Sequence, residues 1–282
     1  MFFKEELSQM SELQKRMISA SLGALLIVNS IYWSEWTYFA IFFGICMFSL
    51  LEFYKLLGLD GNLPLRTFGT LNGLLLFSLS FFIERFDLNT KYYFLCAVSL
   101  TGIYFIKLYV KRDLKPFANI AFTFLGIIYV AVPFSLINVS VFFKQTYSYQ
   151  VILGTMLILW ASDAGAYFAG KRFGKRKLFY RISPKKTWEG SIGGGLAALF
   201  IGYVFSFLFT DLPLWKWLCI SVIIVIAGTY GDLVESLFKR SINIKDSGGV
   251  IPGHGGFLDR FDSLLLSAPF ITAFIKILID FN

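Results

Sequence analysis

The sequence predicts an all-α, polytopic integral membrane protein with about nine transmembrane helices and a polar site that faces the cytoplasm. Hydrophobic residues make up 56% of the 282 positions and only 16% are charged, whereas an average soluble domain has about 25% charged residues. The mean hydropathy is +0.67. The 33 Phe, 14 Tyr and 6 Trp residues exceed what one soluble core can bury, so soluble and disordered classes are excluded.

Apolar stretches long enough to cross a bilayer recur along the whole chain. A transmembrane helix needs about 20 apolar residues. The predicted spans are residues 17–33, 36–54, 68–84, 92–108, 117–142, 150–170, 191–210, 214–232 and 263–281. The fifth is long enough to be tilted, or broken near Pro133.

The basic residues are distributed unevenly between the two sides of these helices. The net charge is +8, and with the N-terminus in the cytoplasm 21 of the 26 Lys and Arg residues lie in cytoplasmic segments. Cytoplasmic loops carry an excess of Lys and Arg, so this pattern predicts the orientation. Twelve of the 21 lie in just two segments, 171–186 and 239–260, which also hold the only histidine.

The first polar segment combines cations with hydroxyl groups. A basic loop that meets anionic lipid headgroups is one interpretation. Two features favour a phosphate site instead. Asp163 lies about two turns inside a predicted span, where a carboxylate is costly and usually functional. Ammonium and hydroxyl donors that suit phosphate oxygens precede a helix that is predicted to start near Glu189. These donors are Ser183, Lys185, Lys186 and Thr187.

The second polar segment presents carboxylates from two predicted helix ends. Asp232, Ser236 and Lys239 are spaced i, i+4 and i+7, so a continuing helix places them on one face. Asp259 and Asp262 are spaced i, i+3 and share a face at the start of the last span. A glycine-rich loop separates the two groups, so we expect them to face one another across it.

Carboxylates beside many cations are typical of Mg²⁺ with phosphates. Mg²⁺ is usually held by one or two carboxylates together with substrate phosphates. Two metal ions can stabilise the attacking and leaving oxygens of a displacement, and the second could be monovalent. The cations of this segment could hold a polyphosphate; they are Lys239, Arg240, Lys245 and Arg260. A solvated loop with ordinary ion pairs is the alternative.

Three further features have both a functional and a structural interpretation. His254, the only histidine, is flanked by glycines that allow the backbone to approach a ligand closely. The run 193–195 consists of three glycines, which could equally serve close helix packing. The three cysteines have no metal-ligand or disulfide spacing.

The signature segment, residues 236–262, resembles the hallmark segment of the phosphatidate cytidylyltransferases (CDP-diacylglycerol synthases). It matches that pattern at Ser236, Lys239-Arg240, Lys245-Asp246, Pro252, His254-Gly255-Gly256, Asp259-Arg260 and Asp262. The first polar segment is similar to the same family at Ser162-Asp163, Ala166-Tyr167 and Ser183 to Gly190. Arg16 and Ile18 to Ala20 are a weaker match.

The resemblance implies an enzyme of phospholipid biosynthesis that transfers CMP from CTP to phosphatidic acid, giving CDP-diacylglycerol and pyrophosphate. It implies catalytic roles for Asp232, Asp259, Lys239, Arg240, His254 and Arg260. Nucleotide and phosphate binding would belong to Asp163, Ser183, Lys185, Lys186, Thr187 and Lys245. Asp232 and Asp259 would be the main ligands of Mg²⁺, with Asp262 and Asp246 as helpers.

The resemblance also implies a setting for the enzyme. We expect a homodimer in the inner (plasma) membrane, with membrane lipids as partners, no nucleic acid, and an active site in a funnel that opens to the cytoplasm. Residues 1–150 then form N-terminal transmembrane helices, and residues 151–282 form the catalytic transmembrane region. The cytoplasmic loops of that region are predicted at 171–189 and 233–262.

Three other functions remain open from the sequence. A CTP-dependent polyprenol or phytol kinase would transfer the γ-phosphoryl group instead. A lipid or anion transporter would also place charges near the membrane, although here the polar residues gather on one side. A purely structural membrane protein leaves the signature segment unexplained.

Overall fold

The computed structural model describes residues 12–111, 113–244 and 256–279, and long helices make up most of them. The N-terminal half holds α2 (Glu12–Trp33), α3 (Glu35–Leu59), α4 (Arg66–Phe86), the short 3₁₀ helix η1 (Thr90–Tyr93), α5 (Phe94–Tyr109), α6 (Pro116–Gly126), η2 (Ile127–Ala131) and α7 (Val132–Val141). The C-terminal half holds α8 (Tyr149–Phe173), β1 (Lys177–Phe179), β2 (Ser183–Thr187), α9 (Trp188–Leu208), α10 (Leu214–Ile223), η3 (Ile224–Gly228), α11 (Thr229–Ser241) and α12 (Leu258–Ile279).

Seven helices of the described residues are long and apolar enough to cross a membrane. They are Glu35–Leu59, Arg66–Phe86, Thr90–Tyr109, Pro116–Val141, Tyr149–Phe173, Trp188–Leu208 and Leu214–Ser241. They coincide with the second to eighth predicted spans, so the predicted fold class is confirmed. Helices α2 and α12, of 22 residues each, overlap the first and last predicted spans. The count of nine stays a prediction.

Helix boundaries differ from the predicted spans where polar residues belong to helices. Helix α11 continues past residue 232 to Ser241, and Lys239 pairs with Glu235 along this polar part of the helix. Hydropathy alone does not detect this part, because its side chains are polar. Helix α12 begins at Leu258 rather than at 263. The predicted loop 171–189 contains an antiparallel hairpin, in which Lys177 lies opposite Thr187.

The long fifth span is continuous rather than broken at Pro133. Helices α6 and α7 are joined by η2, a π-helical stretch that ends two residues before this proline. A second π-helical stretch, η3, joins α10 to α11. Such stretches add a residue to the turn and often occur near functional sites.

Buried polar contacts join the N-terminal helices. The Tyr38 hydroxyl of α3 donates to Asn138 Oδ1 of α7 at 2.8 Å. The Asn138 amide donates to the Phe77 carbonyl at 3.0 Å and to Ser80 Oγ at 2.7 Å, both in α4. These four side chains and backbone groups fix three helices relative to one another, because each buried polar group needs its partner.

Small residues bring α8 and α9 together in the C-terminal half. A Cβ atom added to Gly194 would lie 2.7 Å from the Ser162 carbonyl oxygen, and one added to Gly165 would lie 2.8 Å from the Gly193 carbonyl oxygen. The glycine run 193–195 is therefore used for close helix packing, which was one of its two interpretations.

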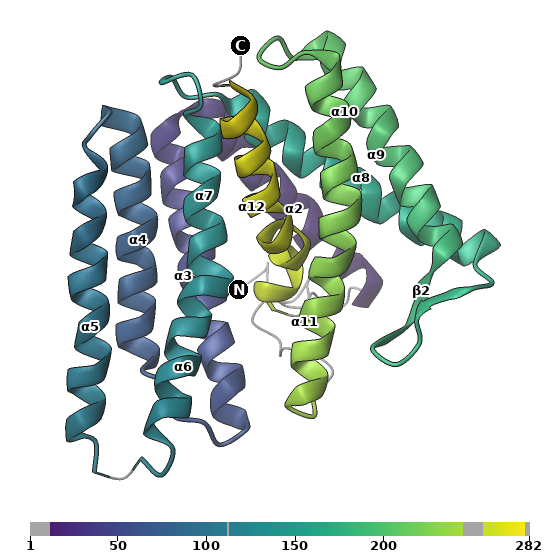
Figure 1. The fold of residues 1–282 in the computed structure, drawn as a ribbon. Helices are drawn as coiled ribbons and strands as arrows, with labels where there is room; N and C mark the ends of the chain where they lie inside the picture. Colours follow the sequence, from purple (N-terminus) through teal and green to yellow (C-terminus); the bar gives the residue numbers. More distant parts are fainter. Residues whose placement is uncertain (1–11, 112, 245–255, 280–282) are drawn as a thin grey trace, which may run out of the picture.

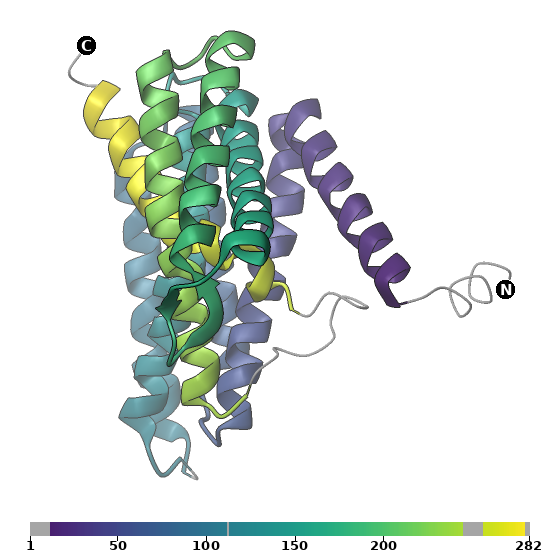
Figure 2. The ribbon, with the colours of Figure 1, turned by 90° about the vertical axis from the view of Figure 1, so that its right-hand side faces the viewer.

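The two halves lie side by side, with α12 between them (Figure 1). Helices α4 and α5 form one edge of the molecule, and α8, α9 and α10 form the other. The β-hairpin projects beyond the end of α9. Helix α2 leans away from the rest of the bundle at its N-terminal end (Figure 2). This arrangement brings α8, α9, α11 and α12 around the polar residues.

Candidate active site

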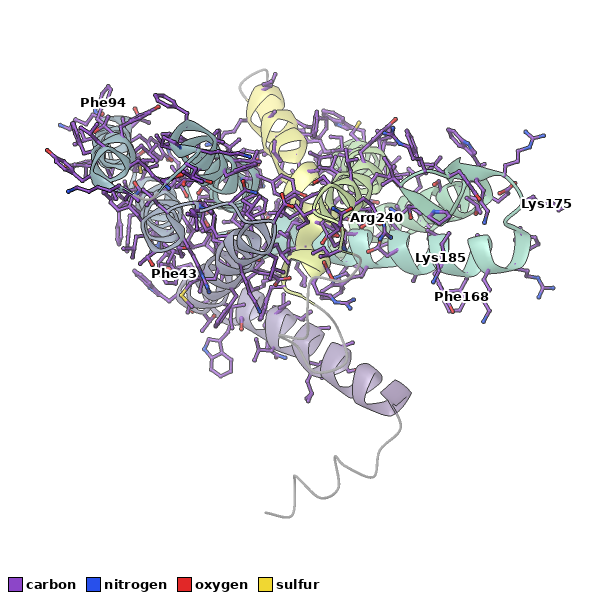
Figure 3. All side chains as sticks on the ribbon, turned by 90° about the horizontal axis from the view of Figure 1, so that it is seen from below. Phe43, Phe94, Phe168, Lys175, Lys185 and Arg240 are labelled. Atoms are coloured by element: carbon purple, nitrogen blue, oxygen red, sulfur yellow. The ribbon has the colours of Figure 1, made fainter. Side chains whose placement is uncertain are left out.

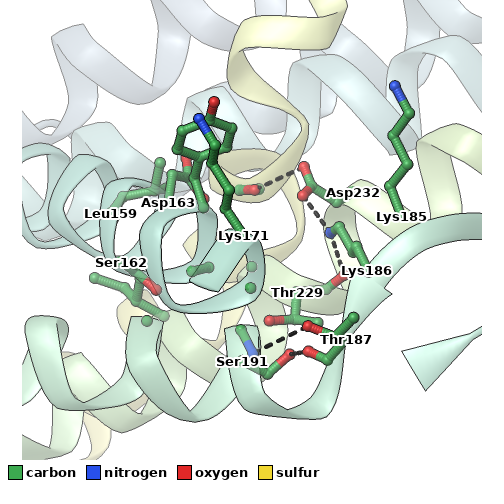
Figure 4. A pocket seen from close by; sticks show the side chains of 18 residues that line it. Leu159, Ser162, Asp163, Lys171, Lys185, Lys186, Thr187, Ser191, Thr229 and Asp232 are labelled. Atoms are coloured by element: carbon green, nitrogen blue, oxygen red, sulfur yellow. Dashed lines mark hydrogen bonds and ion pairs between the residues drawn. The ribbon is translucent and has the colours of Figure 1, made fainter. Parts of the chain in front are cut away.

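A polar cavity of about 430 Å³ lies between α8, β2, α9, α11 and α12 (Figure 4). It is lined by Leu159, Ser162, Asp163, Ala166, Tyr167, Gly170, Lys171, Lys185, Lys186, Thr187, Gly190, Ser191, Gly194, Ile224, Gly228, Thr229, Asp232 and Ser263. The lining thus combines three lysines and two aspartates with hydroxyl groups and glycines. The structure brings the first polar segment together with Asp232 and Ser263, which flank the second.

The β-hairpin positions the lysines of the cavity. Thr187 ends β2 and caps α9, because its hydroxyl accepts a hydrogen bond from the Gly190 N–H at 3.2 Å. The Glu189 carboxylate accepts from the backbone N–H groups of Lys175 and Arg176 at 3.0 and 3.2 Å, which ties the hairpin to the start of α9. Lys186 then points toward Asp232, while the end of Lys185 points away from it (Figure 4).

Asp232 is the centre of a polar network at the cavity wall. It forms an ion pair with Lys186, and its Oδ1 accepts from Ser263 Oγ at 3.1 Å. The side chains of Lys186 and Asp232 remain 27% and 31% exposed, so both reach the cavity. Gly231 permits this contact between α11 and α12, since a Cβ atom there would lie 2.9 Å from Ser263 Cα.

Two carboxyl groups of the site touch one another. Asp262 is 7% exposed, lies on the first turns of α12, and its carboxyl group lies beside that of Asp232 of α11. Its Oδ1 also accepts from the Ser263 N–H at 2.7 Å. Two adjacent carboxyl groups cannot both be ionised unless a cation lies beside them. Asp163 faces the same cavity from α8.

Lys239 joins a second pair of carboxylates below the cavity. Its Nζ lies 3.0 Å from Glu235 Oε2 and 3.2 Å from Asp259 Oδ1. The first pair lies within α11, and the second joins α11 to α12. Glu235, at 2% exposed, was not predicted as a site residue, although its i, i+4 spacing from Lys239 is visible in the sequence.

An apolar groove of about 640 Å³ borders the first turn of α12. It is lined by Ala20, Gly23, Ala24, Leu26, Ile27, Ala40, Ile41, Gly44, Ile45, Phe48, Trp160, Phe257, Arg260 and Phe261. Arg260 is the one charged residue of this lining. Trp160 and Asp163 are one turn apart on α8, so the same helix borders both the groove and the cavity.

The chain matches the cytidylyltransferase family over residues 14–278. It is 32% identical to a phosphatidate cytidylyltransferase of Bacillus subtilis over 271 residues, which cover 93% of this chain and 97% of that relative. It is 45% identical to the protein of that name from Haemophilus influenzae over 129 residues, and 43% identical to one from Staphylococcus haemolyticus over 159 residues.

The chain belongs to the cytidylyltransferase family. The family resemblance of the signature segment is thus confirmed over most of the chain. The Haemophilus and Staphylococcus alignments cover 44% and 55% of this chain and 45% and 58% of those relatives, so in these two the match spans about half of each protein.

Oxygen donors are present for a metal ion in this cytidylyltransferase. The described residues contain no group of three or more His, Cys, Asp or Glu side chains arranged around one point. They do contain the paired carboxyl groups of Asp232 and Asp262 with Ser263 Oγ beside them. Such an oxygen-only donor set fits Mg²⁺ when substrate phosphates and waters complete the coordination.

Not every predicted residue reaches the cavity of this cytidylyltransferase. Ser183 lies at the start of β2, outside the cavity lining. Arg240 donates to the Ile244 carbonyl at 3.3 Å just beyond the end of α11. Seen from below, Lys175 and Lys185 lie toward the hairpin edge and Arg240 lies nearer the middle (Figure 3). Lys245, Asp246 and His254 lie outside the described residues.

Proposed function

We propose that this cytidylyltransferase is a membrane-embedded phosphatidate cytidylyltransferase, which transfers CMP from CTP to phosphatidic acid and releases pyrophosphate. The observation that carries the proposal is that a polar cavity and an apolar groove lie next to each other in the same protein. A polar cavity with lysines and carboxylates and an apolar groove both border the N-terminal turns of α12, the first through Ser263 and the second through Arg260 and Phe261. A nucleotide and a lipid would each find a suitable surface there.

The polar cavity is the proposed site of the nucleotide. Lys171, Lys185 and Lys186 line it and can neutralise the charge of a triphosphate. Lys186 is paired with Asp232 in the structure, and its Nζ also lies 3.5 Å from the Thr229 carbonyl oxygen. Because this pair is partly exposed, a phosphate can approach the lysine without displacing buried groups.

The apolar groove is the proposed site of an acyl chain. Its lining of small and aromatic side chains suits a hydrocarbon tail, which gains about 0.8 kcal/mol for each buried CH₂ group. Arg260 lies on the same helical turn as Asp259 and Asp262, so it can attract a lipid phosphate toward the carboxylates. The printed names of the relatives, phosphatidate cytidylyltransferase, support this lipid.

The proposed reaction is a direct displacement at phosphorus. A phosphate oxygen of phosphatidic acid bonds to the α-phosphorus of CTP, and the bond from that phosphorus to the bridging oxygen of pyrophosphate breaks. The leaving pyrophosphate carries the electron pair away, and the cavity lysines neutralise its charge. No Ser, Cys or His nucleophile is required, since a positioned phosphate oxygen is an adequate nucleophile.

Mg²⁺ is the proposed cofactor, with Asp232 and Asp262 as its holders. When bound, it would supply charge neutralisation for the phosphate oxygens. Asp259, expected from the resemblance as a main ligand, is paired with Lys239 in the structure and stays a proposed ligand, as does Asp246. A second, monovalent ion is also proposed.

The orientation and assembly are also proposed. The 21 basic residues on one predicted side support a polar cavity at the cytoplasmic face of the inner membrane, where CTP is available. A homodimer with surrounding lipids is proposed from the family resemblance.

The test is a product analysis with purified protein in detergent–lipid micelles. CTP labelled at the α-phosphorus is incubated with phosphatidic acid, with Mg²⁺ or with a chelator. We expect label in the lipid fraction and one pyrophosphate per labelled lipid, both lost on chelation. Release of CDP with an unlabelled lipid would indicate a kinase, and lipid or anion flux without CTP consumption would indicate a transporter; either result overturns the proposal.

A further inference from the structure

A buried carboxylate from α3 lies at the start of α12. Glu52 is 4% exposed, and its Oε2 accepts a hydrogen bond from the Phe257 N–H at 2.6 Å. A longer contact of 3.5 Å joins the same oxygen to the Leu258 N–H. These residues are more than 200 positions apart in the sequence, so this is a tertiary contact between the N-terminal helices and the signature segment.

The contact satisfies groups that a helix start leaves without partners. The first N–H groups of a helix have no acceptor within it, and its N-terminus favours a negative charge. On α12 itself, Asp259 Oδ2 accepts a longer hydrogen bond of 3.5 Å from the Gly256 N–H. The carboxylate of Glu52 therefore supplies the shorter hydrogen bond that ends the glycine-rich loop and begins α12.

The same carboxylate occupies the space that a side chain at position 256 would need. A Cβ atom built on this residue would overlap Glu52 Oε1. That oxygen is buried and has no hydrogen-bond partner among the described residues. Only glycine leaves room for the carboxylate, which gives a packing reason for this position of the signature segment.

Stacked rings on α3 support the contact. Phe48, one turn before Glu52, stacks on Phe257 with ring centres 5.1 Å apart and planes at 20°. Phe53 stacks on Phe238 of α11 with centres 5.0 Å apart and planes at 21°. The C-terminal half of α3 thus contacts both α11, through Phe238, and the start of α12, through Phe257.

We propose that Glu52 is a positioning residue for the reaction, which fixes the first turn of α12 so that Asp259 and Asp262 meet Lys239 and Asp232. This role rests on the proposed function. It requires no contact of Glu52 with substrate. A displacement of a reacting group by about 1 Å can cost 10²-fold in rate, so the position of this turn controls turnover.

The first experiment compares E52Q and E52A with the control E84Q in the CDP-diacylglycerol assay. Glu84 is also a helical glutamate with a hydrogen-bonded partner, Lys276 at 3.2 Å, but it lies on α4 away from the cavity. We expect kcat to fall about 10-fold in E52Q and about 100-fold in E52A. The KM for CTP should change less than threefold, and E84Q should behave like wild type.

Thermal unfolding separates positioning from support of the fold. Activity is expressed per folded molecule, taken from the monodisperse fraction. If kcat per folded molecule stays at the wild-type value while the melting temperature falls, Glu52 only supports the fold and the proposal is wrong. If wild-type protein makes no CDP-diacylglycerol, the proposed function fails and this role fails with it; an active wild type with a fully active E52A overturns the positioning role alone.

A double-mutant cycle tests the link between Glu52 and Gly256. G256A should lower kcat about 10-fold in the wild-type background, because it displaces the carboxylate. In the E52A background the added methyl group meets no carboxylate, so G256A should cost less than about threefold. Contacting residues show such coupling, whereas equal effects in both backgrounds would contradict a direct contact.

Discussion

Two lysine–aspartate pairs, Lys107–Asp113 in the N-terminal half and Lys186–Asp232 at the cavity, differ in how completely they are enclosed. The side chains of Lys107 and Asp113 are 3% and 1% exposed, whereas those of Lys186 and Asp232 are 27% and 31% exposed. The first pair has further hydrogen-bond partners in Leu63, Lys115 and Asn119, and the second faces a cavity. The same two residue types therefore serve a structural cluster and a site for ligands.

The partners of the first pair explain its structural role. Lys107 Nζ donates to Asp113 Oδ2 and to the Leu63 carbonyl, each at 2.5 Å. Asp113 Oδ1 accepts from the Asn119 side-chain amide N–H at 2.7 Å, and Asn119 Oδ1 accepts from the Leu63 N–H at 2.8 Å. This cluster joins the two loops that precede α4 and α6. At the cavity, by contrast, Asp232 also lies beside the carboxyl group of Asp262, and a cation bound there would allow both groups to be ionised.

The largest expected effect is the loss of activity in D232N. The substitution keeps the shape of the side chain but removes the charge that holds Lys186 and the proposed metal. We expect kcat to fall about 10³-fold with little change in melting temperature. Steady-state assays of D232N beside D113N measure this, and normal turnover by D232N would remove Asp232 from the proposed active site.

D113N should show the opposite behaviour. Breaking one partner of a buried ion pair costs about 3–5 kcal/mol of folding free energy, because Lys107 is left buried with its charge uncompensated. Turnover per folded molecule should stay near that of wild type. Unfolding in detergent reports the stability, and a variant with unchanged stability would show that the cluster is dispensable.

K186A should lower kcat/KM for CTP about 100-fold, since the phosphates lose a charge-assisted donor at the cavity. K185A should lower kcat/KM by less, because the Lys185 side chain points away from Asp232. Equal effects of the two substitutions would contradict the assignment of Lys186 to the centre of the site. Thermal unfolding of both variants serves as the control for folding.

The stability difference between wild type and D113N should depend on pH. Burial acts to raise the pKa of Asp113, but hydrogen bonds from Lys107, the Lys115 backbone and Asn119 outweigh it and lower that pKa. A lowered pKa in the folded state stabilises the protein above the unfolded value of about 3.9, and this contribution is lost as the pH falls toward the folded value. The difference in melting temperature should be constant from pH 5 to 7 and shrink below about pH 4; shrinkage above pH 5 would contradict the assignment.

The smallest effect is expected at an exposed pair. Arg85 lies 2.9 Å from Glu35, with side chains 37% and 22% exposed. Solvent screening limits such pairs to about 1 kcal/mol or less. R85Q should therefore leave activity unchanged and shift the melting temperature only slightly. A loss of stability as large as that of D113N would show that the exposure of an ion pair does not decide its contribution.

Local patterns were sufficient for the membrane spans and for the polar faces of the last two helices. Hydropathy predicted the seven spanning helices, because the bilayer requires one apolar residue after another along the chain. The spacing of Asp232 and Lys239 predicted one continuing helix, and that of Asp259 and Asp262 a second. Both helices are present in the structure. The β-hairpin was missed because its strands are only three and five residues long and the longer one, β2, has no alternating hydrophobic pattern.

What the sequence by itself determined is the class of protein, the apolar helices and the family, since these follow from composition, local spacing and the signature segment. Only the tertiary structure decided which charges meet. It pairs Lys186 with Asp232, leads Arg260 into the apolar groove, and places Glu52 at the start of α12. The reason is physical: a carboxylate inside an apolar helix must find a partner, but local periodicity carries no information about a partner 205 residues away.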